Sequence, residues 1–360
     1  MRIRVIERGG ATWRPGRYPY VILNCWTRLS DPCKSKLFVL VSGHMPSVTR
    51  IDPKTIFTPE EWASLSGHSW WKGPALIIYA WAVIIGAGAL FIAFPNPITY
   101  VLAVTLIGAR QLGLAILEHD AAHGALHPNA KVNDWLAEWL CGAPVGGSLK
   151  RYRPYHLTHH KYTEQPEDPD LVLSRPFPVT KTSLQRKFIR DLTGQTFYKQ
   201  RIKPAIERML GKKSKPPRVP DRPGMRFWVV NGIMIIATTA LGYWWAWPVL
   251  WIVPMATWLP LVTRLRSMAE HAMVNTEDDP FTHARTTLAN PLERLFIAPF
   301  WVHFHCEHHV FMYVPCYNLE RTHKLLLQKG YRERMRITKG YVEVLKRCAS
   351  KPDEPMPLAA

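Results

Sequence analysis

The sequence has few acidic residues, and it lacks several short motifs that identify common cofactor sites. There are 27 aspartate and glutamate residues against 46 lysine and arginine residues, which gives a formal net charge of +19. No GxGxxG nucleotide-binding fingerprint, CxxCH haem attachment site or iron–sulfur cysteine cluster occurs. The chain therefore has no sequence signal for a nucleotide, haem or iron–sulfur group of its own.

Cysteine is also scarce, and its spacing excludes a disulfide framework of the usual kind. The sequence contains no CxxC pair and no even cysteine spacing. We therefore expect ordinary reduced thiols at the six positions, Cys25, Cys33, Cys141, Cys306, Cys316 and Cys348.

The N-terminal region lacks a continuous apolar core, so no cleavable signal peptide is predicted. It also lacks clear periodicity until Met45, which makes that methionine an alternative to Met1 as the native start. We predict three regions: a poorly ordered N-terminal extension at 1–44, the main domain at 45–345 and a C-terminal tail at 346–360.

Although the sequence is strongly basic, it contains no nucleic-acid-binding motif. Instead, basic residues cluster next to long apolar blocks, around Lys150, Arg151 and Arg153 and again over residues 208–226. Lysine and arginine are enriched in the cytoplasmic loops of membrane proteins. The charge pattern therefore favours a membrane protein over a nucleic-acid-binding protein.

Two apolar hairpins account for the long hydrophobic runs. The first joins residues 74–94 to residues 98–117 through a short uncharged turn, and only Arg110 and Gln111 interrupt the apolar pattern. About 20 residues of helix span the hydrocarbon core of a bilayer. This pair is predicted to be a hairpin of two membrane-spanning helices.

The second hairpin is predicted at residues 227–245 and 249–262, joined by a tryptophan-rich turn. Both hairpins have uncharged turns on one side and basic flanks on the other. We therefore expect a multi-pass protein with four spans, in a bacterial inner membrane, with both termini and the central segment cytoplasmic. The central segment is expected to be helical, apart from a proline-rich linker at residues 215–224.

Nine of the 15 histidines fall into four groups on the predicted cytoplasmic side. Residues at positions i, i+3 and i+4 share one face of a helix, so each group can direct several imidazoles to one place. The HxxHH spacing occurs twice, which a solvated polar helix would not require. The candidate metal ligands are His119 and His123, then His156, His159 and His160, then His271, and finally His305, His308 and His309.

Nine imidazoles exceed the number that one ion can bind, since tetrahedral zinc takes four ligands and octahedral iron at most six. Two metal ions are therefore implied. Imidazole also suits iron, zinc, copper and nickel, so the ligand type does not choose the metal.

Several acidic residues lie close to these histidines in the sequence and could orient their rings through the outer nitrogen. They are Glu118, Glu164, Glu167, Asp168, Asp170, Glu270 and Glu307. Three further histidines, His127, His283 and His303, lie near the groups but outside the repeated spacing, and we expect supporting or incidental roles for them.

Three motifs resemble the histidine boxes of the membrane fatty acid desaturase superfamily in type, order and approximate spacing. They are HDAAH at 119–123, HLTHH at 156–160 and HCEHH at 305–309, and the DPDL that follows the second box is also similar. The resemblance extends over about residues 60–330. Each box alone is a weak signal, but the three together are specific.

The resemblance implies an all-α fold, in which a four-helix membrane bundle of two hairpins carries a cytoplasmic helical cap holding two irons. In that family the irons activate dioxygen to remove hydrogen from an unactivated C–H bond. Because zinc cannot cycle electrons, iron fits this chemistry better. A separate electron carrier of the ferredoxin, rubredoxin or cytochrome type, with its reductase, is implied, because the chain lacks an electron-carrying group.

Two differences from known branches of the superfamily narrow the group that this sequence resembles. Stearoyl-CoA desaturases have an asparagine four residues before the histidine that corresponds to His271, whereas this chain has Ser267. Front-end desaturases begin the third box with glutamine and carry a fused cytochrome b5 domain with HPGG, and this chain has neither. A bacterial branch with desaturase-like and ketolase-like members is nearest.

Desaturation of a fatty acyl chain or related lipid is the expected reaction. A lipid or carotenoid hydroxylase or ketolase would use the same ligands and stays open. A membrane zinc hydrolase would need an open metal position and a general base, but the HExxH motif is absent. A transporter or metal store would place more polar residues inside the spans.

Overall fold

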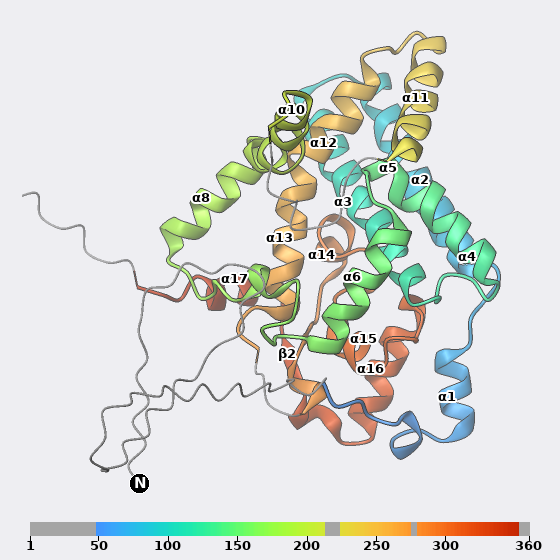
Figure 1. The fold of residues 1–360 in the computed structure, drawn as a ribbon, viewed down its shortest axis with the longest axis vertical. Coiled ribbons are helices and arrows are strands. Elements are labelled where there is room, and N and C mark those ends of the chain that lie inside the picture. Colours follow the sequence, from blue (N-terminus) through green and yellow to red (C-terminus); the bar gives the residue numbers. More distant parts are fainter. Residues whose placement is uncertain (1–47, 213–223, 275–278, 353–360) are drawn as a thin grey trace, which may run out of the picture. The chain divides into compact units, whose positions relative to one another are not determined.

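The computed structural model describes residues 48–212, 224–274 and 279–352. The first 44 residues and most of the linker at 215–224 lie outside these ranges, so the expectations for them stay predictions. The described chain is mostly helical, as the sequence predicts (Figure 1). It is not purely so, because two short strands form a parallel pair.

The first predicted hairpin is present as helices α2 (Lys72–Ala93) and α3 (Pro97–Ala122), which lie side by side (Figure 1). Asn96 begins α3: its side chain accepts the backbone N–H groups of Ile98 and Thr99, which satisfies donors that a helix start leaves unpaired. Both helices are long and apolar enough to cross a membrane. The second continues past the predicted limit at residue 117 and includes His119.

The second hairpin differs from the prediction in its first helix. This helix, α11 (Met225–Ala240), has 16 residues and measures about 24 Å, less than the roughly 30 Å hydrocarbon core. It ends early because Gly242, with φ of +84°, turns the chain just beyond the last helical residue. Four full spans therefore remain a prediction.

The second helix of that hairpin is long and apolar enough to span a membrane, and it runs from Trp247 to His271. It consists of a π-helical turn, η4 (Trp247–Ile252), then α12 (Val253–Ala256) and α13 (Trp258–His271). Because α13 continues without a break, His271 is on the same helix as the predicted span.

The segment between the hairpins is helical where it is described. Its elements are α4 (Ala130–Leu136), the π-helical η2 (Ala137–Gly142), α5 (Ala143–Val145), α6 (Leu149–Tyr162), α7 (Leu171–Ser174), α8 (Lys181–Leu192), α9 (Gln195–Phe197), η3 (Tyr198–Ile202) and α10 (Lys203–Met209). Helix α6 carries the second histidine group.

Short elements make up the ends of the described chain. The N-terminal ones are η1 (Pro53–Thr55) and α1 (Pro59–Ser66). After α13 come η5 (Pro280–Thr282), β1 (Arg285–Thr287), α14 (Pro291–Phe296), α15 (His305–Val310), η6 (Cys316–Asn318), α16 (Leu319–Gln328), η7 (Tyr331–Arg334), β2 (Arg336–Thr338) and α17 (Gly340–Cys348). The strands pair in parallel, with Arg285 opposite Arg336.

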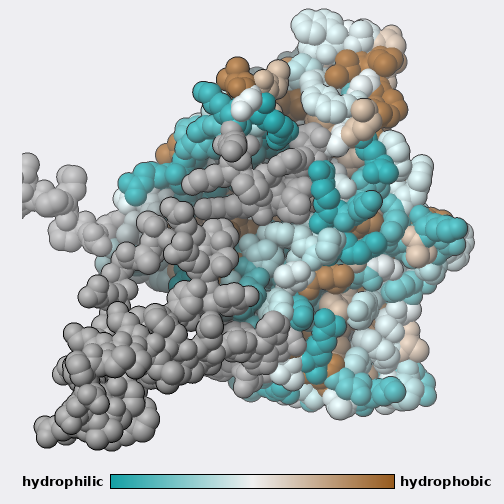
Figure 2. Space-filling view, in the orientation of Figure 1, coloured by the Kyte–Doolittle hydropathy of each residue, from teal (hydrophilic) through white to brown (hydrophobic). Residues whose placement is uncertain are grey.

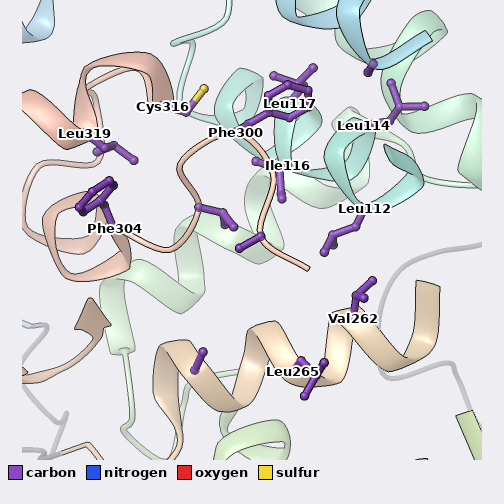
Figure 3. Packing of buried hydrophobic residues seen from close by; sticks show 14 of the residues in the cluster. Leu112, Leu114, Ile116, Leu117, Val262, Leu265, Phe300, Phe304, Cys316 and Leu319 are labelled. Carbon is purple, nitrogen blue, oxygen red and sulfur yellow. The ribbon is translucent and has the colours of Figure 1, made fainter. Parts of the chain in front are cut away.

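The core is built around α3, whose second half is buried almost throughout. Figure 3 shows Leu112 of α3 approaching Val262 of α13 within the buried cluster. A side chain at Gly108 would meet the Cβ of Trp258 at 2.7 Å, so this glycine allows α3 and α13 to pack closely. This packing fixes the relative positions of α3 and α13, whose ends carry His119 and His271.

Apolar side chains also gather on the surface at the end that carries α11 and α12 (Figure 2). Trp228, Ile233, Ile236 and Trp244 are among the large exposed residues there. Contiguous exposed apolar surface is unusual on a soluble protein and is expected where lipid covers it. This surface supports the membrane assignment of the hairpins.

Candidate metal centre

All nine predicted ligand histidines converge in two groups. One group contains five residues, His119, His123, His156, His160 and His308, and the other contains four, His159, His271, His305 and His309. Within each group the nearest ring nitrogens all lie within 4.8 Å of one another. We call them the five-histidine group and the four-histidine group.

Helical geometry explains how each HxxHH motif serves both groups. On α6, His156 and His160 are one turn apart and enter the five-histidine group, while His159 enters the four-histidine group. The motif on α15 divides the opposite way: His308 enters the five-histidine group, and His305 and His309 enter the four-histidine group. The sequence predicts two metals but does not predict this division.

The nitrogen atoms of the five-histidine group form a compact chain. Nε2 of His156 lies 2.9 Å from Nε2 of His123 and 3.0 Å from Nε2 of His160. Nε2 of His160 lies in turn 3.1 Å from Nε2 of His308. The four nitrogens therefore converge on a small common volume.

The four-histidine group has the same spacing. Nε2 of His305 lies 3.0 Å from Nε2 of His271 and 3.1 Å from Nε2 of His309, and the latter is 3.3 Å from Nε2 of His159. The two groups are adjacent, because the rings of His160 and His309 stack with their centroids 4.3 Å apart.

These distances fit a metal ion better than a hydrogen-bonded network. Nitrogens about 2.1 Å from one ion lie about 3.0 Å apart at neighbouring octahedral corners. Each Nε2 of His156, His160 and His305 contacts two others, although a ring nitrogen carries only one hydrogen or one lone pair. Both ring nitrogens of His119 are buried without a hydrogen-bond partner among the described residues.

The protonation of the groups also suits metal binding. Burial lowers the pKa of the His123 imidazole to about 3, and nearby positive charges add to this effect. Burial, together with the neighbouring imidazoles, holds the pKa values of His156, His160 and His308 well below the usual value near 6.5. These rings are therefore neutral at physiological pH, which is the form that binds metals.

One predicted carboxylate contacts the outer nitrogen of a candidate ligand. Nδ1 of His159 donates to Oδ1 of Asp168 at 2.8 Å, and Asp168 is itself fixed by the backbone N–H groups of Glu164 and Asp170. Burial lowers the pKa of His159, but the bond to Asp168 and the charges of Asp168 and Asp170 outweigh it, so the pKa is raised. Asp168 thereby orients the ring and increases its basicity.

Other acidic neighbours have different contacts. The carboxylate of Glu307 accepts from the Thr286 hydroxyl and from Nδ1 of His323, both at 2.5 Å. The carboxylate of Glu270 pairs with Nε of Arg266 at 2.6 Å and lies 3.5 Å from Nε2 of His305.

Two further predicted acids, Glu164 and Glu118, lie near the groups. Oε1 of Glu164 lies 3.8 Å from Nδ1 of His271. The carboxylate of Glu118 occupies the space that side chains at Gly142 and Gly147 would fill. These two glycines therefore allow α3 to carry an acidic residue beside His119.

The three further histidines near the groups, His127, His283 and His303, do not enter either group. The backbone carbonyl of His283 accepts from Nδ1 of His271 at 3.3 Å. Nδ1 of His303 donates to the carbonyl of Thr287 at 2.9 Å, and Nδ1 of His127 accepts the N–H of Asn129 at 3.0 Å. Of the three, only His283 contacts a candidate ligand through these bonds.

Two supporting residues have no sequence signal. Arg153 donates to the carbonyls of Ala121 and Ala122 at the end of α3 and pairs with Asp134, which ties α6 to the first histidine motif. His323 lies outside every motif and is found only through its contact with Glu307 in the fold. In each case the partner is distant in the sequence, so the contact forms only in the fold.

A surface cavity of about 220 Å³ reaches both groups. His160 and His309 line it together with Arg50, Trp62, Phe311 and Tyr313. His309 is also the only one of the nine candidate ligands that is not fully buried. The cavity therefore gives access from outside to one ring of each group.

Replacing Asp168 by asparagine is expected to weaken metal binding in the four-histidine group by roughly 10- to 100-fold, because the ring of His159 loses a charged partner. The metal retained against a graded series of chelator concentrations measures the change. Glu167→Gln is the matched control, because Glu167 is exposed one position earlier. Equal metal retention in wild type and Asp168→Asn would contradict the role given to Asp168.

The comparisons with known proteins agree with the histidine motifs. Residues 95–341 match the model of the fatty acid desaturase family. The chain is 28% identical over 246 residues to the dihydrorhizobitoxine desaturase of Bradyrhizobium elkanii, covering 64% of this chain and 69% of that protein. It is 26% identical over 272 residues to the beta-carotene ketolase of Paracoccus sp. (strain PC1), covering 69% and 90% respectively. The resemblance inferred from the three histidine boxes is thus confirmed, and the chain belongs to the fatty acid desaturase family.

Proposed function

We propose that this protein is a membrane-bound di-iron oxidoreductase that desaturates a fatty acyl chain or a related lipid with dioxygen. The observation that carries the proposal is the pair of adjacent all-histidine groups in a member of this family. When bound, the two irons would supply the dioxygen activation that removes hydrogen from an unactivated C–H bond.

In this proposal the five-histidine group holds one iron and the four-histidine group holds the other. Asp168 orients His159, and the carbonyl of His283 orients His271. Eight of the nine rings are buried, which limits the access of water to the site. The protein thus supplies neutral ligands in fixed positions within a largely closed site.

Electrons are proposed to come from a separate carrier of the ferredoxin, rubredoxin or cytochrome type, supplied by its reductase. The partly exposed ring of His309 and the cavity that contains Arg50 offer a place of approach. A basic surface would attract an acidic carrier, and salt would screen that attraction.

The membrane arrangement completes the proposal. Among the described residues, three helices are long and apolar enough to cross a membrane, and the 16-residue α11 is proposed as the fourth span. Basic residues follow the hairpins on the histidine side, which favours a bacterial inner membrane with the histidines and both termini cytoplasmic.

A lipid or carotenoid ketolase or hydroxylase is the second candidate. The similarity to a beta-carotene ketolase favours it, and the same histidines would serve either reaction. A zinc hydrolase is less consistent with nine converging imidazoles, because a catalytic zinc site uses three protein ligands.

The reaction is tested by the mass of its products. The full chain is expressed in a bacterial host with a ferredoxin and its reductase under isotopically heavy dioxygen, and the cell lipids are compared with those from a His308→Ala strain. We expect wild-type products that lack two hydrogens and carry no heavy oxygen. Incorporated heavy oxygen would favour the hydroxylase or ketolase, and unchanged lipids without oxygen uptake would contradict both candidates.

A further inference from the structure

Arg110 is a charged residue within the apolar helix α3, and it has no part in the histidine groups. Its side chain is nearly inaccessible, with the residue 2% exposed. A charged residue in a spanning helix is costly, so it usually faces a partner, a cavity or a binding site.

The contacts of Arg110 leave part of its guanidinium without a hydrogen bond among the described residues. Nη2 donates to the carbonyl of Leu295 at 2.5 Å and lies 3.5 Å from that of Arg294, at the end of α14. Nε is buried and has no hydrogen-bond partner in the part of the chain that the structure describes. Within the described ranges, neither Arg110 nor Arg294 forms an ion pair with a carboxylate.

Both arginines line one cavity of about 340 Å³ between α2, α3 and α14. The guanidinium carbon of Arg110 lies 5.8 Å from the Tyr79 ring centre and 5.7 Å from that of Phe300. The guanidinium carbon of Arg294 lies 5.8 Å from the ring centre of Trp301. The cavity therefore combines an aromatic wall with two cations that form no direct ion pair among the described residues. The carboxylate of Glu320, which accepts from Nε1 of Trp301 at 3.3 Å, interacts with Arg294 at longer range.

We propose that this cavity binds the anionic head group of a membrane phospholipid. Guanidinium groups bind phosphate oxygens through paired hydrogen bonds, and basic pockets between spanning helices take anionic head groups. Tyr79, 47% exposed, and Ile78, 69% exposed, place the cavity beside the outer face of α2, where lipid tails would pack.

The cavity is separate from the candidate metal centre. None of the nine ligand histidines lines it, and Arg110 precedes His119 by nine residues, or about 13 Å along α3. The proposal therefore does not depend on the reaction proposed above.

The test uses the detergent-purified full chain with three probes: phosphatidylglycerol, phosphatidylcholine and oleate. Native mass spectrometry and thermal unfolding report binding. We expect retained phosphatidylglycerol and a raised unfolding midpoint, with at least a tenfold loss of affinity in Arg294→Gln. Arg294 is half-buried on α14, so this variant is expected to fold where Arg110→Gln could fail.

Arg321→Gln, which removes an exposed arginine on α16, is the control and should bind as wild type does. Equal binding of phosphatidylglycerol and phosphatidylcholine, or full affinity in Arg294→Gln, would overturn the proposal. Binding of oleate without phosphatidylglycerol would also overturn it, since it would assign the cavity to a fatty acid carboxylate.

Discussion

Replacing His308 by alanine is expected to remove the iron proposed for the five-histidine group and nearly abolish turnover. Nε2 of His308 lies 3.1 Å from that of His160, and its ring is 4.4 Å from that of His119, so its loss opens the centre of the group. The fall in activity should exceed the roughly 10- to 100-fold cost of losing an outer hydrogen-bond partner.

The companion variant His309→Ala should remove the other iron, because Nε2 of His309 contacts those of His305 and His159 in the four-histidine group. Iron content, measured by elemental analysis of each purified variant, should fall by about half in each case. His127→Ala is the control, since His127 bonds only to the backbone of Asn129 among the described residues. An active His308→Ala enzyme with full iron content would contradict the assignment.

Replacing Arg285 by methionine is expected to destabilise the fold by about 3 kcal/mol or more. Arg285 is buried, and its guanidinium donates to the carbonyls of Met268, Ala269 and Ala272 at the end of α13. The backbone N–H of Ala272 still donates to the carbonyl of Met268, but the carbonyls of Ala269 and Ala272 lie at the helix end and would lose the hydrogen bond that Arg285 supplies. The same helix end carries His271, so iron content should also fall.

Arg336→Met provides a matched control. Arg336 is the register partner of Arg285 in the parallel strand pair, but it is exposed. Tryptophan fluorescence during thermal unfolding compares the two variants in the same detergent. An Arg285→Met protein that unfolds at the wild-type temperature would exclude the proposed capping of α13.

Local periodicity explains why the histidine groups could be predicted from the sequence. Positions i and i+4 lie on one helix face whatever the rest of the fold does, so the pairing of His119 with His123 and of His156 with His160 follows from spacing alone. The direction of His159 does not, because it depends on how α6 approaches α13 and α15. The division of the motifs between two groups is thus a tertiary property.

The hairpins were also only partly predictable from the sequence. Apolar length predicts α2 and α3 well, because 22 and 26 residues without a strong break can form one helix each. It overestimates α11, where the turn at Gly242 ends the helix inside an apolar run. The contacts of Arg285 and His323 could not be predicted, because each residue is isolated in the sequence and meets its partners only in the fold.

The metal content of the detergent-purified full chain tests the central claim most directly. Elemental analysis should give about two irons per chain, bound by the two histidine groups. One zinc per chain, or no bound metal after purification under conditions that preserve iron, would contradict the di-iron assignment and the reaction proposed from it.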